Sequence, residues 1–220
     1  MRNFNLLITV IFSCSIAWAQ QDLGIVGPNN WLRGWTSFKP LTNDYPQTTR
    51  ILPNVISADF KLSSYETYSL VGEVYVTNNA TLTIEPGTII RASSDEYSAL
   101  IITKGSKIIA EGLTNNPIIF TSSRSAKERK PGDWGGIYIL GNAPINLYGG
   151  VYRIESSIDP NLIVAGGTNA ADNSGSIKNV RVEFAGKGKS KNTVYDAVSF
   201  IGVGTGTIID GIQSSFSNGN

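Results

Sequence analysis

The sequence predicts an all-β solenoid of short strands with an N-terminal cap region and little helix. Short β-branched runs, each closed by Gly, Asn or Pro, recur with a period in the range of roughly 20 to 50 residues that marks solenoids. Glycine is frequent, with 23 in 220 residues, as expected for tight turns between many short strands. No segment shows a 3.6-residue apolar period over about 11 or more positions. The recurring runs are Val74–Val76, Leu100–Ile102, Ile118–Thr121, Val180–Phe184 and Ile212–Phe216.

Residues 1–19 predict an export signal. Arg2 provides the positive start, Leu6 to Ile16 the apolar core, and Ala17–Ala19 an A-x-A cleavage site before Gln20. The apolar core is too short to span a bilayer. We therefore expect an exported protein, either extracellular or at the outer cell surface.

A lipoprotein signal is the alternative, with Cys14 as the lipidated residue that tethers the protein to the outer membrane. Phe12 is bulky for that motif, and the apolar stretch continues past Cys14 to the A-x-A site. These two features favour simple cleavage.

Cleavage at this site removes Arg2 and Cys14, and so leaves 17 basic side chains against 17 acidic ones and no cysteine. An exported protein without cysteine has no disulfides to stabilise it, so burial of apolar surface must do so. Zero net charge argues against a dedicated nucleic-acid or anionic-membrane surface. The mature chain also has no apolar stretch long enough to predict a transmembrane segment.

Residues 20–50 are predicted to form an N-terminal cap, because the first turn of a solenoid exposes apolar residues and unpaired backbone groups. The segment is rich in aromatic residues, which suggests a sugar-stacking surface as the alternative. Residues 51–220 are predicted to form the solenoid itself. The aromatic residues of the cap are Trp31, Trp35, Phe38 and Tyr45.

Within the solenoid, Thr81–Ile84 alternates apolar and polar residues, which is typical of a strand with one buried side. Glu85–Gly87 then predicts a turn, since Pro fixes φ and Gly adopts φ > 0 freely. Lys104–Gly105 and Asn115–Asn116 predict further corners. The other strands expected in this part are Thr88–Arg91, Leu100–Thr103, Lys107–Ala110, Pro117–Thr121 and Trp134–Ile139.

Three phenylalanines close successive runs, and we expect them to point inward at equivalent places on successive coils: Phe120, Phe184 and Phe216. Arg181 and Glu183 are then expected to face solvent, and Ser214 to occupy the place of Val182 one coil later. Two polar or Gly-rich stretches interrupt the repeat and predict excursions from the corners, where insertions disturb the strands least. They are Ser122–Asp133 and Leu147–Ser174.

Four blocks of the sequence resemble a large family of exported β-helix repeat proteins of Bacteroidota: Glu73–Ile90, Asp133–Pro144, Asp172–Gly186 and Gly202–Ser217. The resemblance covers roughly residues 31–220 and implies a right-handed parallel β-helix outside the cell. Members of the family often end in a type IX secretion sorting domain. Since this chain stops in the turn after a strand, we expect it to be an N-terminal fragment whose β-helix is truncated at its C-terminus.

Histidine is absent, and the predicted mature chain lacks cysteine, which removes His-based triads, thiol nucleophiles and zinc sites built on His or Cys. Carboxylate chemistry remains available, because glycoside hydrolysis needs two carboxyl groups about 5–10 Å apart. No two of the available acids occupy equivalent positions on neighbouring predicted coils, so we expect turn and surface roles for them. These acids are Asp95, Glu96, Asp133, Glu183 and Asp210.

Three short motifs offer further candidate sites. Gly186–Ser190 is similar to the end of a P-loop, but Glu183 stands where that motif needs Gly, and we expect a solvated basic turn. Asp172–Ser174 offers oxygen ligands for Ca²⁺, although Asx-rich turns have the same composition. Asn79–Thr81 fits the N-glycosylation pattern and is more simply a corner turn.

The sequence therefore favours a non-enzymatic secreted or cell-surface scaffold with an adhesin-like role, whose expected partners are extracellular glycans or cell-surface components. No catalytic, cofactor-binding or metal-binding residue is assigned, and no cofactor is expected. The alternative is a polysaccharide-degrading lyase or glycosidase whose active site lies mainly in the missing C-terminal part. The tethered lipoprotein is the third hypothesis.

Expressed in its native host, the protein should begin at Gln20 and carry no fatty acid, because the cleavage site follows the apolar core directly. Intact mass spectrometry of the exported protein checks this. A diacylated Cys14 at the N-terminus would contradict the prediction and support the tethered form.

Overall fold

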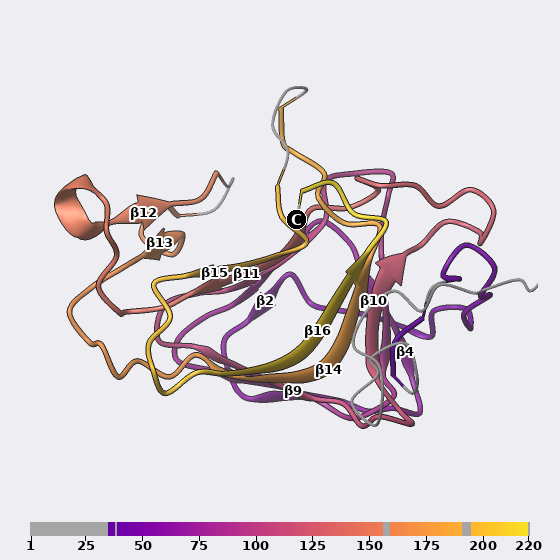
Figure 1. Ribbon diagram of the computed structural model, residues 1–220, viewed down its shortest axis with the longest axis horizontal. Helices are drawn as coiled ribbons and strands as arrows, with labels where there is room; N and C mark the ends of the chain where they lie inside the picture. Colours follow the sequence, from indigo (N-terminus) through magenta and orange to yellow (C-terminus); the bar gives the residue numbers. More distant parts are fainter. Residues whose placement is uncertain (1–34, 38, 156–158, 191–194, 220) are drawn as a thin grey trace, which may run out of the picture.

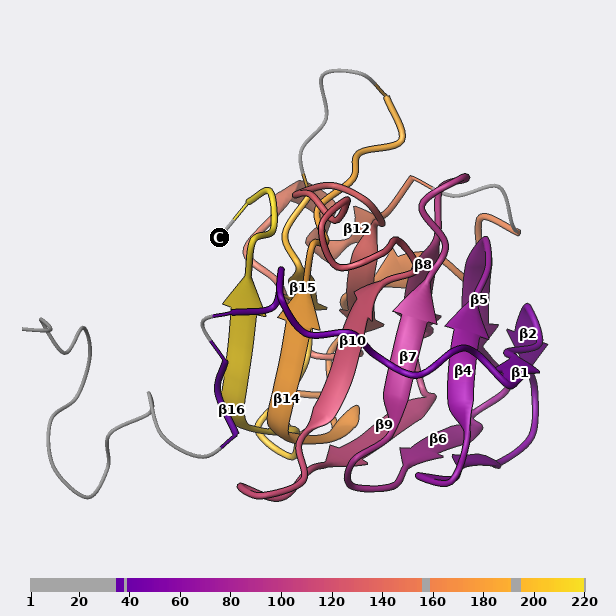
Figure 2. The ribbon, with the colours of Figure 1, turned by 90° about the vertical axis from the view of Figure 1, so that its right-hand side faces the viewer.

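The computed structural model describes residues 35–37, 39–155, 159–190 and 195–219, which wind into a right-handed parallel β-helix (Figures 1 and 2). This confirms the predicted fold. The strands are β1 Arg50–Ile51, β2 Val55–Ile56, β3 Phe60–Leu62, β4 Thr67–Leu70, β5 Glu73–Val76, β6 Thr81–Ile84, β7 Ile89–Ala92, β8 Ala99–Ile102, β9 Lys107–Glu111, β10 Ile118–Ser122, β11 Gly136–Leu140, β12 Tyr152–Arg153, β13 Val164–Ala165, β14 Gly175–Glu183, β15 Val198–Ile201 and β16 Ile208–Ser215.

The coils present three faces. Face 1 is the sheet β2-β5-β8-β11-β15. Face 2 consists of β3, β6, β9 and the first parts of β14 and β16, and face 3 of β1, β4, β7, β10 and the second parts of β14 and β16. Because β14 pairs with β9 through Gly175–Lys178 and with β10 through Val180–Val182, faces 2 and 3 are one continuous hydrogen-bonded sheet.

The described residues contain almost no helix, as the sequence predicts. Among the described residues the only helical segment is η1, a 3-10 turn over Tyr148–Gly150. None of these residues forms a helix that is long and apolar enough to cross a membrane.

The core is built from columns of inward side chains, because parallel strands in register bring equivalent residues of successive coils together. On face 3 one column contains Tyr68, Ile90, Phe120, Val182 and Ser214, in that order. The first four are between 0% and 4% exposed. Ser214 does occupy the place of Val182 in the last described coil, as expected.

Glycines close the corners where the sequence predicts turns. Gly87 has φ +84° and Gly105 has φ +89°, a region that side-chain-bearing residues rarely adopt. At Gly105 a Cβ atom would also lie 2.4 Å from the side-chain oxygen of Asn79 in the neighbouring coil. The Asn79 side chain could turn aside, so it is the positive φ that favours glycine at this corner.

The phenylalanine alignment is partly wrong. Phe184 and Phe216 are equivalent and stacked, with ring centroids 5.8 Å apart. Phe120, however, pairs with Val182, two residues before Phe184, and its ring stacks instead on Trp134 at 6.3 Å. Phe184 and Phe216 have positive φ of 62° and 52°, so each lies in the turn beyond its strand, where strand alternation no longer applies.

The two predicted excursions are present. The first connects β10 to β11, and the second connects β11 to β14 and contains η1 and the antiparallel hairpin β12–β13. Ile154, Ile163 and Ala165 of the second excursion pack on the outer side of face 1 against Ile101 and Tyr138. This excursion thus covers apolar outward residues of face 1.

The described part of the expected cap takes a different position. Residues 35–37 and 39–49, here called the strap, lie across the outer side of face 3, and Figure 2 shows them passing over β10, β7 and β4. At one end Gln213 of β16 exchanges two hydrogen bonds with the backbone of Ser37, and at the other Thr49 N donates to the carbonyl of Thr67 in β4. These residues cover a lateral face of the coils and do not close the first coil. Trp31 and Phe38 lie outside the described residues.

Replacing Phe184 by Ala should lower the free energy of unfolding by about 3–5 kcal/mol, because its ring is fully buried. Phe216→Ala should cost about 1–2 kcal/mol, since this ring is 44% exposed and loses fewer contacts. Both positions have positive φ, so the backbone contribution to the difference cancels. Urea unfolding measures both values, and equal costs would contradict the packing described.

Candidate functional site

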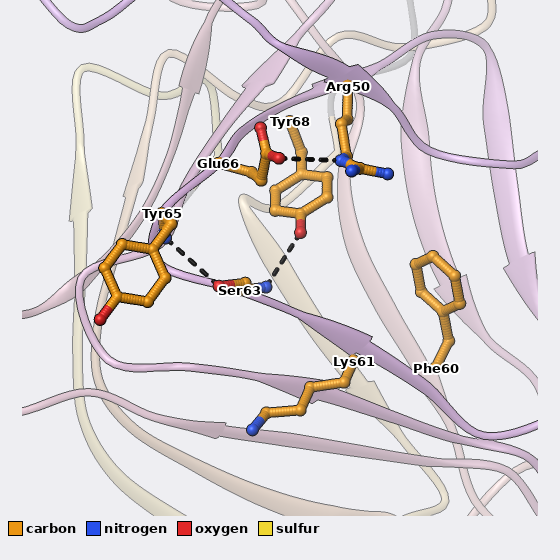
Figure 3. Close-up of a pocket in the computed structure, with 7 residues that line it drawn as sticks. All are labelled: Arg50, Phe60, Lys61, Ser63, Tyr65, Glu66 and Tyr68. Carbon is orange, nitrogen blue, oxygen red and sulfur yellow. Dashed lines mark hydrogen bonds and ion pairs between the residues drawn. The ribbon is translucent and has the colours of Figure 1, made fainter.

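An open pocket of about 490 Å³ lies at the first coil, beside the turn that joins β3 to β4. In Figure 3 the side chains of Arg50, Glu66 and Tyr68 lie above it, and those of Phe60 and Lys61 lie below. The pocket is lined by Arg50, Phe60, Lys61, Ser63, Tyr65, Glu66 and Tyr68. We call it the first-coil pocket.

Aromatic rings provide the apolar part of the pocket. Phe60 belongs to the inward column that continues with Leu82 and Ile108, yet it is 38% exposed at this end. Tyr68 is buried, and its hydroxyl accepts a hydrogen bond of 2.9 Å from the backbone N–H of Ser63. Tyr65, at the tip of the turn, is 95% exposed, so its whole ring is available to a ligand.

Charged side chains surround these rings. Arg50 Nε lies 3.0 Å from Glu66 Oε1, and Lys61 Nζ lies 2.7 Å from the carboxylate of Glu85. The hydrogen bond from Thr49 and the guanidinium of Arg50 hold the pKa of Glu66 below its usual range. The Arg50 and Lys61 side chains remain about two-thirds exposed, at 66% and 64%.

This arrangement suits binding better than proton transfer. Glu66 is the one carboxylate among the pocket residues, and it is held ionised, so it is a poor general acid. Exposed ion pairs such as Arg50–Glu66 contribute little to stability and can exchange partners with a ligand. An aromatic ring beside a guanidinium and a carboxylate provides an apolar surface together with hydrogen-bond donors and acceptors.

Two of the acids considered from the sequence are buried and engaged. Asp133 is 2% exposed and accepts hydrogen bonds from Ser122 Oγ at 2.7 Å and from Arg124 Nε at 3.1 Å. Glu183 is 1% exposed and accepts the hydroxyl of Tyr45 at 3.0 Å. Both are inaccessible to a polymeric substrate.

The solvent-facing positions predicted for Arg181 and Glu183 are therefore wrong. Both side chains do project outward from face 3, but the strap covers them, leaving Arg181 8% exposed. The sequence does not reveal this, because the covering residue, Tyr45, is more than a hundred positions away.

The remaining acids are exposed, and Asp210 is separate from the other two. Asp95 and Glu96 lie in the corner between β7 and β8, whereas Asp210 lies on face 2 opposite Lys178 of β14. No register pair among the described strands joins two of the five acids considered.

The short motifs have structural roles. Gly186–Ser190 follows β14 as an irregular segment, where Lys187 Nζ donates to the carbonyls of Ser94 and Glu96, so no P-loop geometry is present in it. Asp172 accepts the hydroxyl of Ser174 at 2.9 Å, and the described residues contain no group of three or more metal-ligating side chains. Asn79, with φ 58°, forms the predicted corner turn.

Sequence reasoning missed a cluster of tyrosines on the outer side of face 1. Lys189 Nζ lies 2.6 Å from Glu73 Oε1 and 5.1 Å from the ring centre of Tyr97. The hydroxyls of Tyr97 and Tyr138 are 3.3 Å apart. Burial raises the pKa of Tyr97 to about 12 and raises that of Tyr138 further, so these phenols stay protonated at neutral pH.

The cluster extends to a second carboxylate. The ring of Tyr138 meets that of Tyr195 edge-on at 5.9 Å, and the Tyr195 hydroxyl donates to Glu155 at 3.1 Å. We call Tyr97, Tyr138 and Tyr195 the tyrosine cluster. Its members come from three separate coils. The sequence predicts only that Tyr138 points outward, because it alternates with inward apolar residues in its strand, whereas Tyr97 and Tyr195 lie outside the strands.

The stacked coils and their three faces define a protein of the right-handed parallel β-helix class. Residues 54–219 match the sequence profile of the pectate-lyase like β-helix domain, so the chain belongs to this family. No match was found among curated proteins or among solved structures.

The stability of the folded protein should fall with rising pH because of Glu183. Burial raises the pKa of this carboxyl in spite of the nearby Arg181 and Arg129 guanidiniums and the hydrogen bond from Tyr45. The folded state then retains a proton that the unfolded state releases near pH 4.3, so its stability decreases above that pH, by about 1.4 kcal/mol per unit of pKa difference.

Glu183→Gln keeps an acceptor for Tyr45 and should remove this decrease, as urea unfolding between pH 4 and 8 would show. Glu85→Gln is the matched control, since the bond from Lys61 lowers the pKa of Glu85 to about 2. Relative to that variant, the wild type should gain stability as pH rises from about 2 to about 4, so the unfolding series for this control begins at pH 2. Parallel profiles for wild type and Glu183→Gln would contradict the prediction.

Proposed function

We propose that this protein is a non-enzymatic, exported β-helix scaffold that contacts extracellular glycans through the first-coil pocket. The observation that carries the proposal is the exposed ring of Tyr65, which lines the same pocket as the Arg50–Glu66 ion pair. Sugars present an apolar C–H side that packs on an aromatic ring, and hydroxyl groups that bond to guanidinium and carboxylate groups.

The position of the pocket supports the proposal. The β-helix below it is rigid, because every strand around the pocket continues a hydrogen-bonded ladder into the next coil. A site on a rigid element binds with a smaller ordering cost than one on a free loop. Tyr65 itself is in a short turn, whose neighbour Ser64 is fixed by a hydrogen bond of 3.0 Å from its N–H to Glu85.

Export and surface location are part of the proposal. They rest on the predicted signal in residues 1–19, which lie outside the described residues, and on the resemblance to exported Bacteroidota proteins. Sorting by type IX secretion rests on that resemblance alone.

A polysaccharide-degrading activity is the second candidate. It is favoured by the family, described as pectate-lyase like, and by the tyrosine cluster, where two carboxylates, Glu73 and Glu155, lie among phenols and the ammonium of Lys189. Carboxylates flanked by hydrogen-bond donors are the groups that glycoside chemistry employs.

Tyr65→Ala should weaken binding to the best ligand in a panel of soluble plant and bacterial polysaccharides by about tenfold, or ~1.4 kcal/mol, the scale of one aromatic contact. Isothermal titration calorimetry or affinity electrophoresis measures the change. Tyr148→Ala is the matched control, since Tyr148 is equally exposed but lies on the second excursion, and it should bind as the wild type does.

Equal losses in both variants, or no binding to any polysaccharide by the wild type, would sink the pocket proposal. Reducing-end release by the wild type that disappears in Glu73→Gln or Glu155→Gln would transfer the function to the tyrosine cluster. Tyr65→Ala should leave any such activity unchanged.

A further inference from the structure

A layer of charged side chains lies buried between the strap and face 3. Arg91, Arg129 and Arg181 are only 4%, 4% and 8% exposed, and Glu183 is 1% exposed. Arg91 of β7 pairs in register with Thr121 of β10. The residue before Thr121, Phe120, pairs with Val182 of β14, so the next residue of β14, Glu183, lies opposite Thr121. Arg91 and Glu183 therefore stand in one outward column, two coils apart.

All four groups surround Tyr45 of the strap. Arg91 Nη1 donates to its carbonyl at 3.3 Å, and the guanidinium carbon of Arg129 lies 4.9 Å above its ring. Its hydroxyl donates to Glu183. Arg181 is close enough to Tyr45 and to Glu183 to influence the titration of both. The four charges therefore share one small, desolvated region.

Two of the arginines donate hydrogen bonds to backbone carbonyl groups. Arg91 donates to four of them and Arg129 to three, from the strap and from the first excursion. Carbonyl dipoles satisfy hydrogen bonds, but they carry no net charge. These contacts position the guanidiniums without neutralising them.

Arg181 makes no hydrogen bond to any of the described residues. Its Nε is fully buried and lacks a hydrogen-bond partner among them, and Arg91 Nε and Arg129 Nη2 are buried and unpartnered as well. The two strand neighbours of Arg181 in register are Ile119 and Gln213, and the amide of Gln213 is already engaged with Ser37. Arg181 is thus the one arginine of the layer that makes no hydrogen bond to the described residues.

The layer contains an excess of positive charge. The buried carboxylates among the described residues are Asp133, Asp172 and Glu183. Asp133 is paired with Arg124, and Asp172 is bonded to Ser174, so Glu183 is the one buried carboxylate that faces the three guanidiniums. The exposed Asp44 of the strap adds a second carboxylate near Arg91, and one positive charge is still uncompensated. Leaving buried cations without a counter-charge is strongly destabilising, and a water molecule would satisfy a donor without supplying charge.

We propose that a small monovalent inorganic anion, of the class of chloride, binds at Arg181 between the strap and face 3 and supplies the missing negative charge. The anion then couples the strap to the β-helix, because it neutralises the layer that both surfaces enclose. The inference does not depend on the proposed glycan contact, which concerns the first-coil pocket and none of the residues of this layer.

The experiment compares thermal unfolding of the predicted mature protein in sodium chloride and in sodium gluconate at equal ionic strength, since gluconate is too large for a buried site. Above the dissociation constant, each tenfold rise in chloride should raise Tm by about 3 to 6 °C in a domain of this size. Arg181→Met should abolish the chloride dependence, because it removes the cation while retaining an apolar stem.

Arg153→Met, on the exposed hairpin, is the matched control and should keep the wild-type dependence. A crystal of the wild-type protein grown in bromide tests the site directly, with an anomalous peak expected next to the Arg181 guanidinium. Equal chloride dependence in wild type and Arg181→Met, or no bromide peak there, would overturn the proposal.

Discussion

Parallel pairing in fixed register between successive coils is the constraint on which the rest of the structure depends. It repeats each position at intervals of about 4.8 Å, so each side chain lies against the equivalent side chains of the coils above and below. Inward positions thereby become continuous apolar columns, such as Tyr68, Ile90, Phe120 and Val182. Outward positions become columns too, and the same register places Arg91, Thr121 and Glu183 in line on face 3.

The outer sides of the coils are covered in two different ways. On face 1 the second excursion folds back and packs apolar residues against Ile101 and Tyr138. On face 3 the strap covers a mostly polar surface, to which it is attached by hydrogen bonds such as that from Tyr45 to Glu183. The first cover relies on apolar burial and the second on charge and hydrogen bonding, which is why the buried charges gather on face 3.

Charged residues consequently have opposite roles at the two sites discussed above. In the first-coil pocket the Arg50–Glu66 pair is exposed, so water screens it and a ligand can compete for either partner. Under the strap the guanidiniums are removed from water, so each needs a compensating partner. Exposure therefore makes the pocket suitable for reversible recognition, whereas burial makes the arginine layer a structural element.

The sequence by itself determined the solenoid, the position of most strands and the glycine corners, because these depend on local alternation and on turn residues such as Gly87 and Gly105. Tertiary structure decided the alignment of Phe120 with Val182, since a positive φ at Phe184 shifts that residue out of its strand. It also decided that Arg181 and Glu183 are buried, and it assembled the first-coil pocket and the tyrosine cluster. Those features arise where segments distant in sequence meet, and no local pattern encodes which outward residues a distant segment will cover.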